Sequence, residues 1–254
     1  MNALLELITM LQGFIKSILS YGKAFQLIQR FRLWFYVFVP GLISLCLGIL
    51  IALSVWNYAD DIGNWMTSWY SWKGEGIVEK IGSIISGIAI VFLTFLLFKY
   101  IIIIAVSPFM SLLSEKVERR LKNQTASTPF KLDKFLKDMV RGLSLALRNI
   151  FWELLFTVLL LLVSFIFPII APFTAVLIFI IQAYYAGFGN MDFTMERHFN
   201  FKESVQFVRR NRGLAIGNGA VFLWMLLTGI GFLFAPTLAT IAGTVEVVKV
   251  LEEK

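Results

Sequence analysis

Long apolar runs without charge alternate with short charged segments along the chain. The longest of these runs reaches from Leu154 to Met191 and contains no Asp, Glu, Lys, Arg or His. One bilayer crossing needs only about 20 apolar residues, because the hydrocarbon core is about 30 Å thick. Pro168 and Pro172 interrupt the run, and proline lacks the N–H that a continuous helix requires. The pattern therefore predicts a helical hairpin with its corner at Phe167–Pro172, which we call hairpin 1.

A second uncharged run, 213–245, predicts hairpin 2, because Gly229, Gly231 and Pro236 lie near its middle. The two corners form a weak repeat, since the Ala-Pro step that begins Ala171-Pro172-Phe173-Thr174 returns in Ala235-Pro236-Thr237-Leu238. Transporters use broken helices of this kind to build substrate sites. Irregular backbone at membrane depth needs protein or water around it. We therefore expect hairpins that penetrate the membrane halfway, with tips that meet each other or line a cavity.

Three further segments complete the predicted membrane domain. Residues 33–56 carry no charge and predict a transmembrane helix, and 81–114 predict a longer one with a single charge, Lys99. Residues 1–32 place apolar side chains at helical spacing, which predicts an amphipathic helix at the bilayer surface. The fold class is an all-α integral membrane protein of one domain, 1–254. It has two long transmembrane helices, two proline-hinged, half-penetrating helical hairpins and an N-terminal amphipathic helix.

The charges between the apolar runs predict how the chain is oriented in a membrane. Hydrophobic residues make up 58% of the chain and charged residues 15%, with a formal net charge of +7. Cytoplasmic segments of membrane proteins are enriched in Lys and Arg, so this charge indicates orientation in a lipid bilayer rather than nucleic-acid binding. We expect a multi-pass protein of the inner (plasma) membrane with both termini in the cytoplasm. The loop 57–80 faces outward, hairpin 1 covers 154–191, and the cytoplasmic parts are 1–32, 115–153, the connector 192–212 and the tail 246–254.

No residue pattern typical of an enzyme, a cofactor or a metal centre stands out. The single histidine, His198, lies in a polar connector and is typical of a structural residue. The single cysteine, Cys46, excludes an internal disulfide. We therefore expect no catalysis, no cofactor and no bound metal.

Two features point to anion binding, and each has a plainer alternative. Arg209, Arg210 and Arg212 precede the helix expected to begin near Gly213. Free N–H groups and the helix dipole attract anions there, although arginines at this place equally fit the cytoplasmic charge bias. Lys99 is a functional candidate because it lies inside an apolar segment; alternatively, its side chain snorkels to a nearby interface.

Three blocks of sequence resemble the CysZ-type sulfate permease family, whose superfamily includes the etoposide-induced membrane proteins. The first, 107–121, begins Ser-Pro-Phe and matches the family block small-Pro-Phe-x-x-Leu-Leu-x-Glu; the others are 192–201, around Arg197-His198, and Tyr36–Pro40. The resemblance implies two long transmembrane helices, two half-penetrating hairpins, a homo-oligomer and passive sulfate uptake. The motif residues are Ser107, Pro108, Phe109, Leu113, Glu115, Asp192 and His198.

Members of that family carry Gly-Leu-Arg-Arg just before the first helix, and these arginines bind sulfate. The aligned positions here read Arg32-Leu33-Trp34-Phe35, and Arg30 and Arg32 lie about one helical turn away. We hypothesise a CysZ-like membrane transport protein for sulfate or another small anion. Its anion would be gathered at one cytoplasmic mouth by Arg30, Arg32, Arg209, Arg210 and Arg212. The alternative is a non-transporting membrane scaffold or lipid-interacting protein of the same fold.

Overall fold

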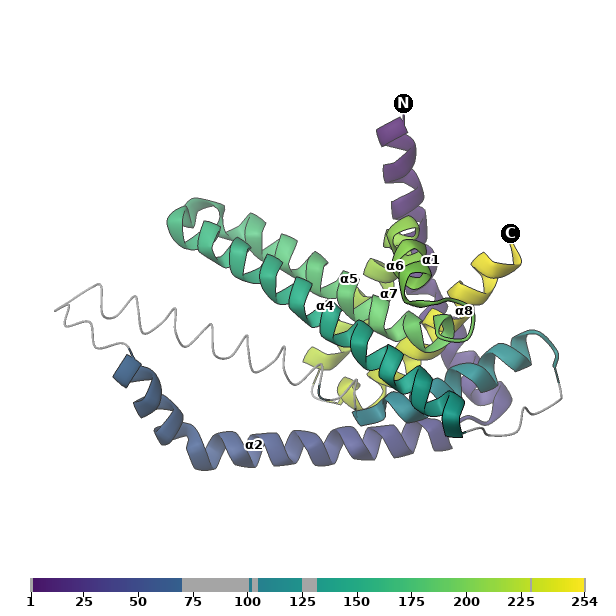
Figure 1. Ribbon diagram of the computed structural model, residues 1–254, viewed down its shortest axis with the longest axis horizontal. Coiled ribbons are helices and arrows are strands. Elements are labelled where there is room, and N and C mark those ends of the chain that lie inside the picture. Colours follow the sequence, from purple (N-terminus) through teal and green to yellow (C-terminus); the bar gives the residue numbers. More distant parts are fainter. Residues whose placement is uncertain (1, 70–100, 102–104, 125–131, 229, 254) are drawn as a thin grey trace.

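The computed structural model describes residues 2–69, 101, 105–124, 132–228 and 230–253. These residues form helices and turns without a β-strand (Figure 1), so the predicted all-α class is confirmed for them. The helices are α1 (Asn2–Phe31), α2 (Phe35–Trp69), a helix over residues 105–121, α4 (Leu132–Ile166), α5 (Ala171–Met195), α6 (Phe201–Arg210), α7 (Arg212–Leu227) and α8 (Ala235–Glu252). Two short 3₁₀ turns, η1 (Pro168–Ile170) and η2 (Gly231–Leu233), complete the described elements.

Both predicted hairpin corners are present, and they are built alike. In hairpin 1, η1 joins α4 to α5, and in hairpin 2, η2 lies between α7 and α8. The helix after each turn begins with Ala-Pro. Proline suits that position because the first N–H groups of a helix have no partner within it. The repeat seen in the sequence therefore marks two equivalent helix starts. Figure 1 shows α4 and α5 side by side as a long hairpin.

The two hairpin tips differ in their surroundings. No residue of η1 is buried, whereas η2 packs against α2, where a Cβ added at Gly41 would lie 3.0 Å from the carbonyl oxygen of Leu233. Figure 1 places the tip of hairpin 1 far from η2. Of the two predicted alternatives, tips that meet each other are therefore not found among the described residues, and tips that line a cavity stay a prediction. The hairpins are also longer than predicted, because charged turns continue their helices: α4 begins at Leu132 and α8 ends at Glu252.

Helix α2 contains a proline, and a residue at the tip of hairpin 2 supplies the hydrogen-bond donor that this proline lacks. Pro40 lies inside the helix and has no N–H to donate to the carbonyl of Tyr36, four residues earlier. The hydroxyl of Thr237, which is fully buried at the start of α8, donates to that carbonyl at 2.9 Å. Buried backbone groups need such partners. The second Ala-Pro corner therefore satisfies the orphan carbonyl of the predicted first transmembrane helix.

Replacing Thr237 by Val should destabilise the protein by about 1 to 3 kcal/mol, because the carbonyl of Tyr36 would lose its donor. In a Pro40→Ala background the new alanine N–H can bond that carbonyl, so the same Thr237→Val change should cost less. Unfolding by SDS titration, followed by circular dichroism, measures both differences. Equal costs in the two backgrounds would show that the hydroxyl does not substitute for the missing N–H.

Hairpin 1 carries buried polar side chains on one face and exposed apolar side chains on another. On α4, Asn149, Glu153 and Thr157 follow one buried face at four-residue spacing. The exposed face of hairpin 1 carries Phe165 and, at the tip, Ile169, which is 89% exposed. A water-soluble protein buries the second group and exposes the first. Among the described residues, three helices are long and apolar enough to cross a membrane: Leu4–Phe31, Val140–Ile166 and Pro168–Met195. The chain is built as a membrane protein.

Glycines bring α7 into close contact with its neighbours. A Cβ added at Gly213 or Gly217 would lie 1.9 or 2.5 Å from a carbonyl oxygen of α1. One added at Gly219 would lie 1.8 Å from the carbonyl oxygen of Ala183 in α5. Small residues allow such approaches between membrane helices. α1 therefore packs along α7 at the glycines of α7, and the leucines and isoleucines of α1 as far as Leu19 stay exposed.

Two predicted boundaries differ from the structure or lie outside it. The helix expected over 33–56 begins at Phe35 and continues to Trp69, into the segment predicted as the outer loop 57–80. Asp60 and Asp61 end the uncharged run there, but a charge does not end a helix. Most of the predicted span 81–114, including Lys99, lies outside the described residues.

Candidate functional site

The predicted basic site lies at the break between α6 and α7. Asn200 begins α6 with a capping box, since its side chain accepts from the N–H of Glu203 while the carboxylate of Glu203 accepts from the N–H of Asn200. At the other end, the side chain of Asn211 donates to the carbonyl of Phe207 at 2.9 Å and makes no capping bond to α7. The first turn of α7 is thus left without a side-chain cap, which favours an anion there.

Beside this break lies a cavity of about 590 Å³ between the start of α1 and the α6–α7 junction. Its wall includes Arg209, Arg210 and Arg212, which are all exposed, and one acidic residue, Glu6. None of the three arginines forms an ion pair with a described residue. The remaining lining residues are Leu7, Thr9, Met10, Gly13, Asn211, Gly213 and Leu214. The local charge balance therefore favours an anion.

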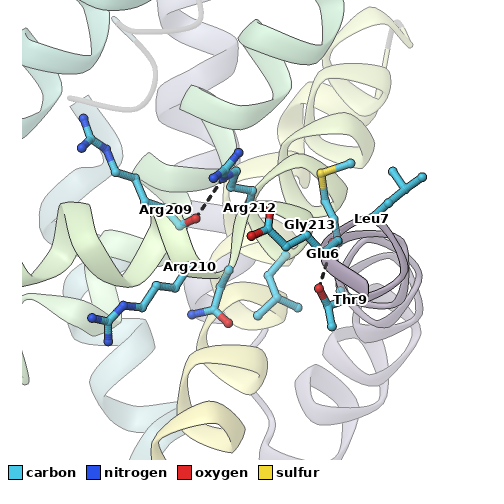
Figure 2. Close-up of a pocket in the computed structure, with 11 residues that line it drawn as sticks. Glu6, Leu7, Thr9, Arg209, Arg210, Arg212 and Gly213 are labelled. Carbon is cyan, nitrogen blue, oxygen red and sulfur yellow. Dashed lines mark hydrogen bonds between the residues drawn. The ribbon is translucent and has the colours of Figure 1, made fainter. Parts of the chain in front are cut away.

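The three arginines do not converge on one point (Figure 2). Arg209 and Arg210 extend away from α1 in different directions, and the Nε of Arg212 donates to the carbonyl of Arg209 at 3.0 Å. The arrangement raises the local anion concentration. It does not form a closed clamp like a bidentate arginine site.

Arg30 and Arg32 lie far from this cavity, so the structure does not bring all five predicted arginines together. Gly13 lies at the cavity, where its added Cβ would be 3.2 Å from the backbone nitrogen of Leu214. α1 is continuous from Gly13 to its end at Phe31. A helix rises 1.5 Å per residue, so Arg30 lies about 25 Å further along its axis. The sequence shows two groups of arginines, one at the end of α1 and one at the cavity, but it does not show the distance between them.

Two of the three resembling blocks, 107–121 and 192–201, meet in an ion cluster around the buried Glu118, which we call the Glu118 cluster. Of the motif residues, it contains His198. Arg197 donates from Nε and Nη2 to Oε2 of Glu118 at 3.0 and 2.9 Å, and from Nη1 to the hydroxyl of Ser114 at 2.9 Å. His198 Nε2 lies 2.6 Å from the other oxygen of Glu118, and Lys122 donates to it at 2.7 Å. Ser111 bonds Glu196 nearby. Residues of the blocks 107–121 and 192–201 thus bind each other in the folded protein.

Charge and hydrogen bonding keep Glu118 ionised. Burial alone would raise the pKa of its carboxyl. The hydrogen bonds from His198 and Lys122, with the charge and hydrogen bond of Arg197, outweigh burial and lower the pKa from 4.5 to about 2. The carboxylate is therefore a structural anchor between the helix 105–121 and the connector. His198 is part of this anchor, as expected for a structural histidine.

The other motif residues also serve packing and pairing. Asp192 accepts two hydrogen bonds of 3.1 Å from Arg141 of α4, which also donates to the hydroxyl of Ser204 at 2.6 Å. Glu115 pairs with Arg119 one turn later. Leu113 is fully buried and Phe109 packs against the same hydrophobic cluster, while Ser107 and Pro108 are half-buried. These contacts tie the helix 105–121, α4 and α5 into one body.

A second group of buried polar residues joins α5, α7 and α8, and the sequence reasoning missed it. Asn190 donates to the side-chain oxygen of Asn218 at 3.0 Å, and Asn218 donates to the carbonyl of Ala239 at 2.9 Å. Thr194 bonds Thr244 at 2.9 Å. The available signal was an asparagine inside each uncharged run, since amides in membrane helices find partners on neighbouring helices.

The fold of the described residues defines the class of the protein as an all-helical membrane protein with buried polar groups between its helices. A family model described as "Sulfate transporter CysZ/Etoposide-induced protein 2.4" matches residues 20–236, and the chain belongs to this family. The match contains the Glu118 cluster, both corners and the three arginines of the cavity. No individual curated protein matches the chain.

Proposed function

We propose that the protein is a membrane transport protein that carries sulfate or another small divalent anion passively across the bilayer. Membership of the CysZ family supports transport rather than catalysis. The observation that carries the anion assignment is the cavity, where Arg209, Arg210 and Arg212 have no acidic partner among the described residues. An open basic mouth concentrates anions while binding them weakly enough for release.

Sulfate uptake into proteoliposomes tests this proposal. Replacing Arg209, Arg210 and Arg212 together by Gln should lower the uptake rate about tenfold or more, because one charge-assisted hydrogen bond contributes roughly 1.5 to 3 kcal/mol. The matched control replaces Lys16, Lys137 and Lys202 by Gln. These lysines are also exposed and lie outside the cavity wall, so this variant should keep more than half of the rate.

Each alternative gives a different result in that assay. Equal losses in the two triple variants would show that a diffuse surface charge, not the cavity, attracts the anion. Uptake by the unmodified protein no faster than in protein-free liposomes would overturn the transport proposal and favour the scaffold alternative.

We further propose that both termini and the connector lie in the cytoplasm and that the protein is a homo-oligomer of the inner membrane. The basic segments flanking the hairpins support this orientation. In a Cys46→Ser background, cysteines placed at Lys202 and Glu252 should react only from the cytoplasmic side and one at Asn57 only from outside. Reaction at Lys202 from outside would refute the orientation. Light scattering in detergent measures the oligomer.

A further inference from the structure

The end of α1 has an unusual geometry that presents two arginines. Arg32 adopts a left-handed backbone with φ 53°. Its N–H bonds the carbonyl of Gln29 at 3.4 Å and the N–H of Leu33 bonds that of Ile28 at 3.0 Å. This is a Schellman motif, in which glycine usually takes the left-handed position. Arg30 and Arg32 are both exposed on this turn.

The helix 105–121 brings two more cations to the same place. The guanidinium carbon of Arg30 lies 5.7 Å from the centre of the Phe31 ring, and that of Arg120 lies 5.8 Å from the same centre. Nζ of Lys116 lies 5.2 Å from the centre of the Tyr36 ring. Packing fixes this arrangement, because the buried Ile28, Leu33, Leu113 and Val117 belong to one hydrophobic cluster against which Phe31 and Tyr36 pack. We call Arg30, Arg32, Lys116 and Arg120 the basic turn.

The four cations of the basic turn lack acidic partners among the described residues. The two nearest carboxylates on the helix 105–121 are already engaged, Glu115 by Arg119 and Glu118 by Lys122, Arg197 and His198. Four exposed like charges around two aromatic rings repel one another. An anion bound among them would relieve this repulsion.

Apolar aromatic side chains adjoin the basic turn and select the kind of anion. Trp34, in the turn before α2, and Phe35 and Phe38, in the first turn of α2, are all exposed, and Phe38 is 65% exposed. Tryptophan and neighbouring cations are typical of the level of lipid headgroups. A free inorganic anion would not contact these rings, whereas the acyl chains of a lipid would.

We propose that the basic turn binds the phosphate headgroup of an anionic phospholipid, whose acyl chains lie along Trp34, Phe35 and Phe38. This site is separate from the cavity at Arg209, Arg210 and Arg212, and it does not depend on the transport proposal. The cation–π contacts hold Arg30, Lys116 and Arg120 in place, so less side-chain freedom is lost when the phosphate binds.

The test measures lipid retained by the protein after extraction from vesicles of seven parts phosphatidylcholine and three parts phosphatidylglycerol, read by native mass spectrometry. The unmodified protein should retain phosphatidylglycerol in excess of its share. The Arg30→Gln/Arg120→Gln variant should retain at least fivefold less. A Lys16→Gln/Lys202→Gln control loses the same charge elsewhere and should behave like the unmodified protein.

A second pair keeps the test decisive if that variant does not fold. Arg32→Gly/Lys116→Gln removes two charges of the basic turn, and glycine suits the left-handed position, so folding should be preserved and retention should fall at least fivefold. Unchanged retention in the folded pair, or retention of the two lipids by the unmodified protein in their vesicle proportion of seven to three, would overturn the proposal. Displacement of phosphatidylglycerol by millimolar sulfate would assign the basic turn to a small anion instead.

Discussion

Replacing Gly187 by Ala should destabilise the protein by more than about 3 kcal/mol. An added Cβ at this position would lie 1.8 Å from the carbonyl oxygen of Ala215 and 2.9 Å from the backbone nitrogen of Gly219, both in α7. Backbone atoms cannot rotate away, so α5 and α7 would have to separate. That separation would also weaken the bond between Asn190 and Asn218. Overpacking of a core commonly costs 1 to 3 kcal/mol, and here a polar contact is lost in addition.

Gly189→Ala is the matched control for this prediction. It changes the same residue type on the same helix, but no atom lies within 4 Å of its added Cβ. Alanine in a helix interior is favoured over glycine by roughly 0.5 to 1 kcal/mol, so this variant should be slightly more stable. SDS titration followed by circular dichroism compares the two. If Gly187→Ala were as stable as Gly189→Ala, the close approach of α5 and α7 would be refuted.

The sequence predicted the hairpin corners because their cause is local. Proline at 168, 172 and 236 and glycine at 231 act on the backbone within a few residues, and the structure places η1 and η2 at these positions. The ends of the long helices were predicted less well. Charges at Glu153 and Asp60 indicate where apolar runs stop, but α4 and α2 continue through them. A charged residue indicates where contact with lipid ends. A helix can continue through that residue, because it needs only its internal backbone hydrogen bonds.

The candidate site was predicted as residue types but not as an arrangement. The cavity arginines follow from their position before a helix start, which the sequence shows directly. The separation of Arg30 from Arg209 follows from the direction of α1 relative to α7, which only tertiary packing determines. The ion-pair partner of Glu118 could not be identified from the sequence either, because Arg197 is 79 residues away and the chain contains many other basic residues.

Replacing Arg197 by Ala should destabilise the protein by about 3 kcal/mol. The side chain of Glu118 is only 8% exposed, and removing one member of a buried ion pair typically costs 3 to 5 kcal/mol. His198 and Lys122 still bond the carboxylate, so the lower end of that range is expected. Arg197→Lys should recover only part of the loss, since an ammonium cannot form the fork to Glu118. Arg119→Ala, which removes a more exposed pair with Glu115, should cost less than about 1 kcal/mol.

The same cluster predicts an acid-dependent loss of stability. The pKa of Glu118 is about 2 in the folded protein against an ordinary 4.5. A carboxyl with a lowered pKa stabilises the fold above its unfolded pKa, and this stabilisation is lost as the pH falls from 4.5 toward 2. Glu118→Gln lacks a titrating group at this place, so its stability relative to the unmodified protein should improve across that window. Thermal unfolding of both proteins between pH 6 and the acid limit of the detergent-solubilised fold measures the difference. A constant difference across this range would show that the ion pairs with Arg197 and Lys122 do not lower the pKa of Glu118.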